Sequence, residues 1–103
     1  MTRREFLLIC LNEECHEVGQ RVDKALRFGL EEAQPGQPYT NAERIYSEFA
    51  DLLGVMEMLQ EDGAIATTTL ACLRSMIDAK KEKVAHYMGY SVECGTLDIE
   101  AVQ

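Results

Sequence analysis

Two long segments of the chain repeat apolar residues at intervals of three and four positions, the spacing that places them on one face of an α-helix. We expect the first helix over about residues 3–28 and the second over about residues 41–62. Each is preceded by a threonine and has a glutamate three residues later, which is the spacing of a capping box. The segment between them, Leu30–Tyr39, holds both prolines and is expected to be either a connector or a mobile cover for a ligand.

Each predicted helix carries two acidic residues three positions apart, at the margin of its apolar face. The pairs are Glu14 with Glu17 and Glu48 with Asp51. Residues at i and i+3 are neighbours on a helix surface. Four clustered carboxylates oppose folding unless a cation neutralises them, because like charges disfavour each other's ionised forms. The pattern therefore predicts a divalent metal site, and a set of carboxylate ligands favours Mg²⁺, with Mn²⁺ as a substitute.

A third helix is expected after Thr67–Thr69 and ends, by its apolar pattern, at Met88 and Gly89. Lys80 lies in the middle of its apolar face. A lysine there either extends along the helix to the surface or reaches an internal anionic partner. Because an acidic metal site is predicted nearby, Lys80 and, one turn later, Lys83 are candidate contacts for substrate phosphates.

The predicted fold is an all-α helical bundle of three main helices per chain, of the four-helix-bundle type and completed by oligomerisation. Residues 1–89 would form the helical domain and residues 90–103 a C-terminal tail. A chain of 103 residues with apolar flanks to spare is expected to bury them against copies of itself, as a homodimer or homotetramer.

The formal net charge of −8 argues against a nucleic-acid polymer as partner, because the chain repels a phosphate backbone and has no basic tract. A phosphate-bearing substrate would then need metal ions to mediate its contact. The longest apolar run, Phe6–Leu11, is far shorter than the ~20 residues that cross a bilayer, so we expect no membrane partner. With no export signal recognised either, a cytoplasmic location is expected. The four cysteines lack zinc-ligand spacing and are expected to be reduced and structural.

Two other interpretations of the acidic residues deserve comparison. Glu13-x-x-His16 matches one element of a di-iron carboxylate site, but such sites need that element twice. The other histidine, His86, has a lysine three positions before it, so the second element is missing. The second interpretation is a non-catalytic helical interaction module, in which the acidic pairs only form a solvated face.

The acidic motifs resemble a known family. Glu13-Glu14-x-x-Glu17, followed about thirty residues later by Glu48-x-x-Asp51-Leu-Leu, is similar to the E-E-x-x-E … E-x-x-D signature of the MazG-like all-α nucleoside triphosphate pyrophosphohydrolases. The resemblance covers about residues 5–60, and the separation of the two motifs is slightly longer than is usual in the family.

This resemblance implies Mg²⁺-dependent hydrolysis of a (d)NTP to a (d)NMP and pyrophosphate, in a helical fold completed by oligomerisation. The implied metal ligands are Glu14, Glu17, Glu48 and Asp51. Glu13 would be an accessory carboxylate, and Lys80 matches the family's phosphate-holding lysine. The chemistry of a metal-bound water adds candidate catalytic carboxylates, since Glu13 or Glu17 could orient or deprotonate that water. Phosphoribosyl-ATP pyrophosphatase, of the same superfamily, remains an alternative. The candidates for contacts with the base are Phe28, Tyr39, Asn41 and Tyr46.

Overall fold

The computed structural model describes residues 1–102, and within them the chain is helical without any strand. The elements are α1 (Arg3–Phe28), α2 (Asn41–Glu61), α3 (Leu70–Glu93) and a short 3-10 helix, η1 (Ile99–Val102). The all-α prediction is therefore confirmed. The chain forms two compact units: Met1–Ala66 contains α1 and α2, and the second unit begins at Thr67.

Each α-helix has as its N-cap a threonine of the segment that the sequence indicates, namely Thr2, Thr40 and Thr69. The Thr2 hydroxyl accepts a hydrogen bond from the backbone N–H of Glu5, whose carboxylate accepts one from the backbone N–H of Thr2. Thr40 and Glu43 form the same capping box at the start of α2. Such caps satisfy backbone donors that the first turn of a helix leaves without partners. At the other end of α1, Gly29 adopts φ 103°, a conformation that glycine reaches without the strain other residues suffer.

Two predicted features differ from the structure. First, α3 continues through Gly89 to Glu93, so the first residues of the predicted tail 90–103 are helical. A glycine inside a helix costs only about 1 kcal/mol, and the turn is instead made at Gly95, with φ 78°. Second, the four-helix bundle that we expected does not match the three α-helices of the described chain.

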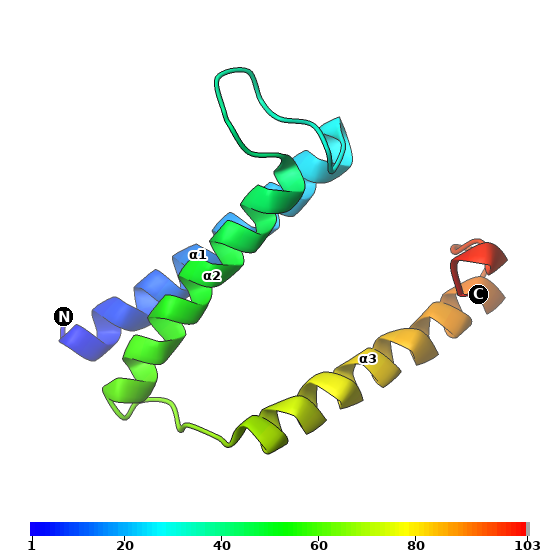
Figure 1. Ribbon diagram of the computed structural model, residues 1–103. Coiled ribbons are helices and arrows are strands. Elements are labelled where there is room, and N and C mark those ends of the chain that lie inside the picture. The colour runs from blue at the N-terminus through cyan, green and yellow to red at the C-terminus, as the bar shows by residue number, and fades with distance from the viewer. Residues whose placement is uncertain (103) are drawn as a thin grey trace. The chain divides into compact units, whose positions relative to one another are not determined.

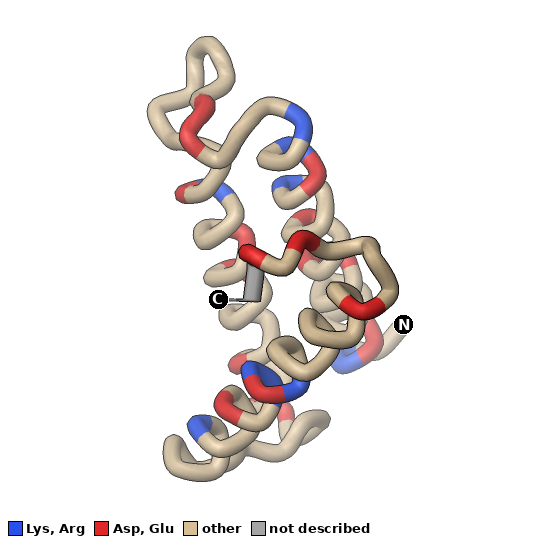
Figure 2. The backbone as a smooth tube through the Cα atoms, turned by 90° about the vertical axis from the view of Figure 1, so that its right-hand side faces the viewer, with Lys and Arg blue, Asp and Glu red and all other residues tan. Residues whose placement is uncertain are grey.

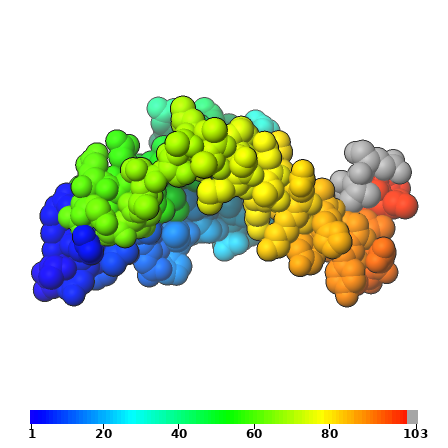
Figure 3. Space-filling model, turned by 90° about the horizontal axis from the view of Figure 1, so that it is seen from below, coloured from blue at the N-terminus to red at the C-terminus, as the bar shows by residue number. Residues whose placement is uncertain are grey.

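In the first unit, α1 and α2 pack side by side as an antiparallel hairpin (Figure 1). In the space-filling view, atoms of the start of α1 lie against the end of α2 (Figure 3). The buried apolar core is small and consists of Leu7, Ala25 and Leu59, of which Leu59 is fully buried. Because this core is so small, polar contacts at the two ends of the hairpin matter for its alignment.

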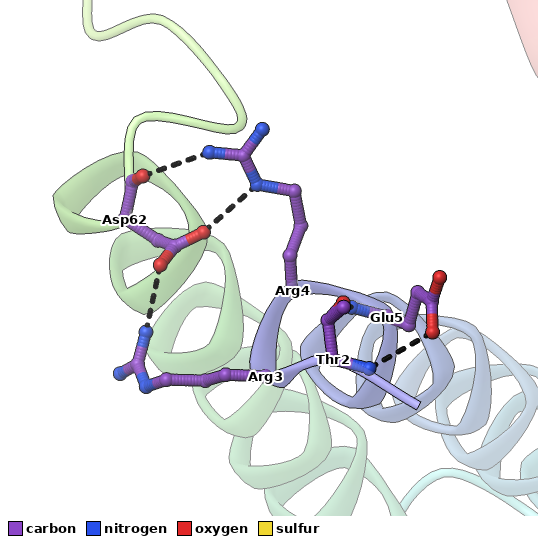
Figure 4. A network of polar contacts seen from close by, with 5 residues as sticks. All are labelled: Thr2, Arg3, Arg4, Glu5 and Asp62. Carbon is purple, nitrogen blue, oxygen red and sulfur yellow. Dashed lines mark hydrogen bonds and ion pairs between the residues drawn. The ribbon is translucent and has the colours of Figure 1, made fainter.

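At the open end of the hairpin, two arginines of α1 bind one carboxylate at the end of α2 (Figure 4). Arg3 Nη1 donates to Asp62 Oδ1 over 3.1 Å, and Arg4 Nε donates to Asp62 Oδ2 over 2.9 Å. Arg4 Nη2 also donates to the backbone carbonyl of Asp62. These contacts fix the start of α1 opposite the end of α2.

At the loop end, Asn41 ties the end of α1 to the start of α2. This side chain is only 3% exposed, and its Nδ2 donates to the Gly29 carbonyl over 2.9 Å and to Glu32 Oε2 over 3.1 Å. The backbone N–H of Ala42 donates to the Leu30 carbonyl. A buried amide with its hydrogen bonds satisfied is the kind of polar group that fixes a loop. These are the contacts of a connector.

Much apolar surface remains exposed on the helices of both units, including Leu26 on α1, Leu53 on α2 and Leu70 on α3. All four cysteines are free thiols; Cys10 is half-buried, and the other three are exposed rather than part of a core. None of the helices in the described residues has both the length and the apolarity to cross a membrane.

We expect Asp62→Asn to lower the melting temperature at neutral pH, because it weakens the contacts of both arginines. The hydrogen bond from Arg4, followed by the charges of the two guanidinium groups, holds the pKa of Asp62 below its ordinary value. Its stabilising contribution is therefore present above the ordinary aspartate pKa and is lost as the pH falls through the lowered one. Thermal unfolding followed by circular dichroism, from neutral pH downward, should show the difference from wild type shrinking on acidification.

The matched control is Asp78→Asn, since Asp78 pairs with Arg74 of the same helix in an exposed i,i+4 contact. Exposed pairs of this kind contribute little, so this variant should melt close to wild type. Equal melting temperatures of Asp62→Asn and wild type at neutral pH would show that the arginine contacts do not stabilise the hairpin.

Candidate metal centre

Three of the four predicted metal ligands come together between α1 and α2. Carboxylate oxygens of Glu14, Glu48 and Asp51 all lie within 4.8 Å of one another. Glu14 and Glu48 are half-buried, and Asp51 is exposed. Figure 2 shows acidic residues on both helices of the hairpin. We call these three residues the acidic triad.

The helical geometry explains why Glu14 takes part. At ~100° per residue, Glu14 lies about 20° from the direction shared by the buried Leu7 and Ala25. It therefore points along the seam with α2. Glu48 and Asp51 are neighbours one turn apart on α2. With the hairpin ends fixed by Asp62 and Asn41, the single carboxylate of α1 meets the pair of α2.

Glu17, the fourth predicted ligand, is exposed and is not part of the group that converges within 4.8 Å. It lies about 60° further round α1 than Glu14, which turns it toward solvent. Glu13, the predicted catalytic partner, is also exposed. Both are nevertheless close enough for their negative charges to act on Glu14. The structure thus places Glu13 and Glu17 around the triad without bringing them into it.

The arrangement of the acidic residues has an electrostatic cost for Glu14. Its pKa is raised above the ordinary glutamate value, with partial burial as the largest cause. Four neighbouring carboxylates raise the pKa further; in decreasing order they are Asp51, Glu48, Glu17 and Glu13. Burial and like charges both disfavour the ionised form of a carboxylic acid. The site is therefore one that a cation would relieve.

The donor set fits a magnesium ion. Mg²⁺ takes oxygen ligands at ~2.0–2.1 Å, so two oxygens on one ion lie at most about 4.2 Å apart. The oxygens of the acidic triad lie within 4.8 Å of one another, so the three carboxylates would have to draw slightly closer together to share one ion. Mg²⁺ is usually held by one or two carboxylates, with waters and substrate phosphates completing its shell. Three carboxylates at the half-exposed edge of a hairpin are compatible with that pattern.

The two predicted phosphate contacts lie in the second unit. There Lys80 and Lys83 of α3 line a hollow together with Tyr87 and Ser91. Both lysines are exposed. Their role with a substrate of the acidic triad stays a prediction. His16 is exposed.

Two features near the triad were not predicted from the sequence. Arg21 is half-buried, and its Nε and Nη1 atoms are buried without a hydrogen-bond partner among the described residues. Arg21 follows Glu14 by seven positions, so it lies two turns along the same face of α1. The second feature is a hollow that includes Glu48 together with Arg44 and Ser47. In the sequence, Arg44 precedes Glu48 by four positions and Ser47 precedes it by one. This spacing was the available indication that they lie near Glu48.

No family model matches the chain, and no curated protein or solved structure does so either. The resemblance to MazG-like enzymes accordingly rests on the two acidic motifs, and it stays a prediction. The function proposed below is argued from the geometry of the triad and from the chemistry of its residues.

We expect Glu14→Gln to raise the melting temperature of the metal-free protein at neutral pH. A raised pKa means that the folded state binds more protons than the unfolded state between the ordinary and the raised value, so stability falls as the pH rises through that window. The glutamine variant escapes this loss, and its advantage should vanish below the ordinary glutamate pKa. Melting curves in EDTA across this pH range measure the effect.

The same variant should lose the response to Mg²⁺. A ligand that binds only the folded state raises its stability, so Mg²⁺ should raise the melting temperature of wild type and leave Glu14→Gln nearly unchanged. A metal-free Glu14→Gln that melts below wild type at neutral pH would contradict the repulsion we describe.

Proposed function

We propose that the protein is a Mg²⁺-dependent nucleoside triphosphate pyrophosphohydrolase that converts a (d)NTP into a (d)NMP and pyrophosphate. The observation that carries the proposal is the convergence of Glu14, Glu48 and Asp51 from two helices within 4.8 Å. It is supported by the likeness of the two motifs to the MazG-like signature. Mn²⁺ is the expected substitute for Mg²⁺, and the cytoplasmic location expected from the sequence stays a prediction.

In the proposed reaction, a water molecule attacks the α-phosphorus and the bond from that phosphorus to the bridging oxygen breaks. The bridging oxygen leaves with the pyrophosphate. When bound, Mg²⁺ supplies neutralisation of the phosphate charge and lowers the pKa of a water. Glu14, Glu48 and Asp51 would hold the ion. A carboxylate oxygen of Glu13 or Glu17 accepts the proton of the attacking water, as general bases of this type do.

A feature of Arg21 is a further argument that the substrate is an anion. Its Cα lies about 10 Å along α1 from that of Glu14, from seven residues at 1.5 Å each, and two of its side-chain nitrogens lack an acceptor among the described residues. A buried donor without a partner is costly. Phosphate oxygens are strong acceptors for a guanidinium. A phosphate group of a substrate held at the triad would supply such an acceptor.

We expect Glu48→Gln to lower pyrophosphate release by about 100-fold or more, because the change removes one of the charges that hold the metal. The assay is release of pyrophosphate from a panel of dNTPs with Mg²⁺. Glu57→Gln is the matched control, since Glu57 is an exposed carboxylate of the same helix outside the triad, and it should keep wild-type activity.

The same assay separates the alternatives. Turnover of phosphoribosyl-ATP in preference to every dNTP would reassign the substrate within the superfamily. Wild-type protein that releases pyrophosphate from none of these substrates would contradict the proposal and favour the non-catalytic interaction module.

We also propose that the chain forms a homodimer or homotetramer, in which copies cover the apolar side of the hairpin. Leu8, Val22 and Leu26 lie on the flank of α1 opposite to Glu17, and all three are exposed. Leu53 lies on the flank of α2 away from Asp51 and is exposed as well. Apolar patches of this kind mark association surfaces. Copies packed there would leave the acidic side open.

We expect light scattering after gel filtration to give at least twice the mass of one chain for the wild type. Leu53→Glu should lower this mass, because it places a charge in the proposed interface. Met58→Glu is the matched control, since Met58 is exposed on the acidic flank of the same helix. A wild type with the mass of a single chain would contradict the proposed oligomer.

A further inference from the structure

The hollow beside the acidic triad contains aromatic side chains that the metal chemistry does not use. Its lining residues are Tyr39, Glu43, Arg44, Tyr46, Ser47 and Glu48. We call it the aromatic hollow. All six belong to the first unit, and one of them, Glu48, is also a member of the triad. Glu48 therefore borders both the hollow and the acidic triad.

The exposure of the two tyrosines is what needs an explanation. Tyr46 is 74% exposed and Tyr39 is 58% exposed, although both rings border the same hollow. The ring of Tyr46 lies 6.3 Å from that of Phe49, a distance within the range of aromatic pairs. Exposed aromatic rings at a concave surface offer a stacking platform for a planar ligand.

The polar groups of the hollow indicate which planar ligands it suits. Two carboxylates, Glu43 and Glu48, border it and would repel a phosphate placed there. The guanidinium of Arg44 has five N–H bonds that can donate. Its Nη1 donates to Gln34 Oε1 over 3.3 Å. Ser47 adds a hydroxyl that both donates and accepts. A few donors and acceptors around aromatic faces suit a heterocycle with a polar edge, because such a ligand both stacks and hydrogen-bonds.

We propose that the aromatic hollow binds the nucleobase of the triphosphate whose phosphates are held at the acidic triad, an inference that rests on the proposed function. Glu48 stands at the junction between the two parts of the site. The neutral base occupies the aromatic side and the charged phosphates the metal side. The chain then distinguishes nucleotides from inorganic polyphosphates of the same charge.

The test measures binding rather than turnover. The probes are the four α,β-methylene deoxynucleoside triphosphates, which cannot be cleaved at the bond in question, and inorganic tripolyphosphate, which has no base. Calorimetric titrations with Mg²⁺ should show Tyr46→Ala weakening the tightest of the four analogues about 10-fold, the scale of one lost stacking contact, with tripolyphosphate binding unchanged. Tyr46→Phe, which keeps the ring, should retain most of the affinity.

Two further variants complete the design. Tyr39→Ala tests the second ring and should also weaken the analogue selectively. Tyr90→Ala is the matched control, because Tyr90 is 59% exposed on α3 and does not line the hollow; its binding should equal that of wild type. Circular dichroism confirms that each variant is folded.

The outcomes separate this inference from the proposed function. Selective weakening by Tyr46→Ala supports the hollow even if no dNTP is hydrolysed. Equal weakening of tripolyphosphate and the analogue, unchanged binding of both, or binding of none of the four analogues to wild type would overturn it. A change in oligomeric mass in Tyr46→Ala with unchanged analogue binding would instead assign the surface to an interface between copies.

Discussion

The alignment of α1 against α2 is the constraint on which the candidate site depends. Three acidic residues meet only because the two helices are held at one register along their common seam. The apolar core is too small to fix that register alone, since only Leu7, Ala25 and Leu59 are buried. Polar contacts fix the two ends instead, through Asp62 at one and Asn41 at the other. A slip of one helical turn would move Glu14 by about 5.4 Å and separate the carboxylates.

This alignment stabilises a charge arrangement that is unfavourable by itself. The pKa of Glu14 is raised by partial burial and by the carboxylates around it, so the metal-free site weakens the hairpin that forms it. A divalent cation, as we propose for this site, would reverse the sign of the contribution. The same logic applies to the proposed function, in which a chain of net charge −8 acts on an anion. In that proposal a cation, the half-buried Arg21 and the neutral aromatic hollow would each reduce the repulsion that a triphosphate meets.

Local sequence patterns predicted the helices well because their signals are local. Thr2 and Thr40 with their capping glutamates mark two helix starts, and the observed α1 and α2 follow the expected bounds within a residue. The end of α3 was misplaced because Gly89 was taken as a stop, whereas a helix tolerates one glycine when the following residues continue it. The triad was partly predictable, since i,i+3 spacing puts Glu48 beside Asp51. Whether Glu14 or Glu17 faced them depended on the hairpin seam, which is set by long-range contacts such as that of Asp62. Two residues that line the hollow, Tyr39 and Tyr46, were already candidates for contacts with the base. That they share one hollow with Arg44 depends on three-dimensional shape, which the sequence pattern did not indicate.

The central claim is that carboxylates of two helices hold one divalent cation. Crystals soaked in Mn²⁺ and measured at its absorption edge test it most directly, because anomalous scattering locates the ion without reference to activity. The account predicts a peak at about 2.0–2.2 Å from oxygens of Glu14, Glu48 and Asp51. Bound Mn²⁺ at other residues only, or carboxylates of the triad that turn apart into solvent with no ion between them, would contradict it.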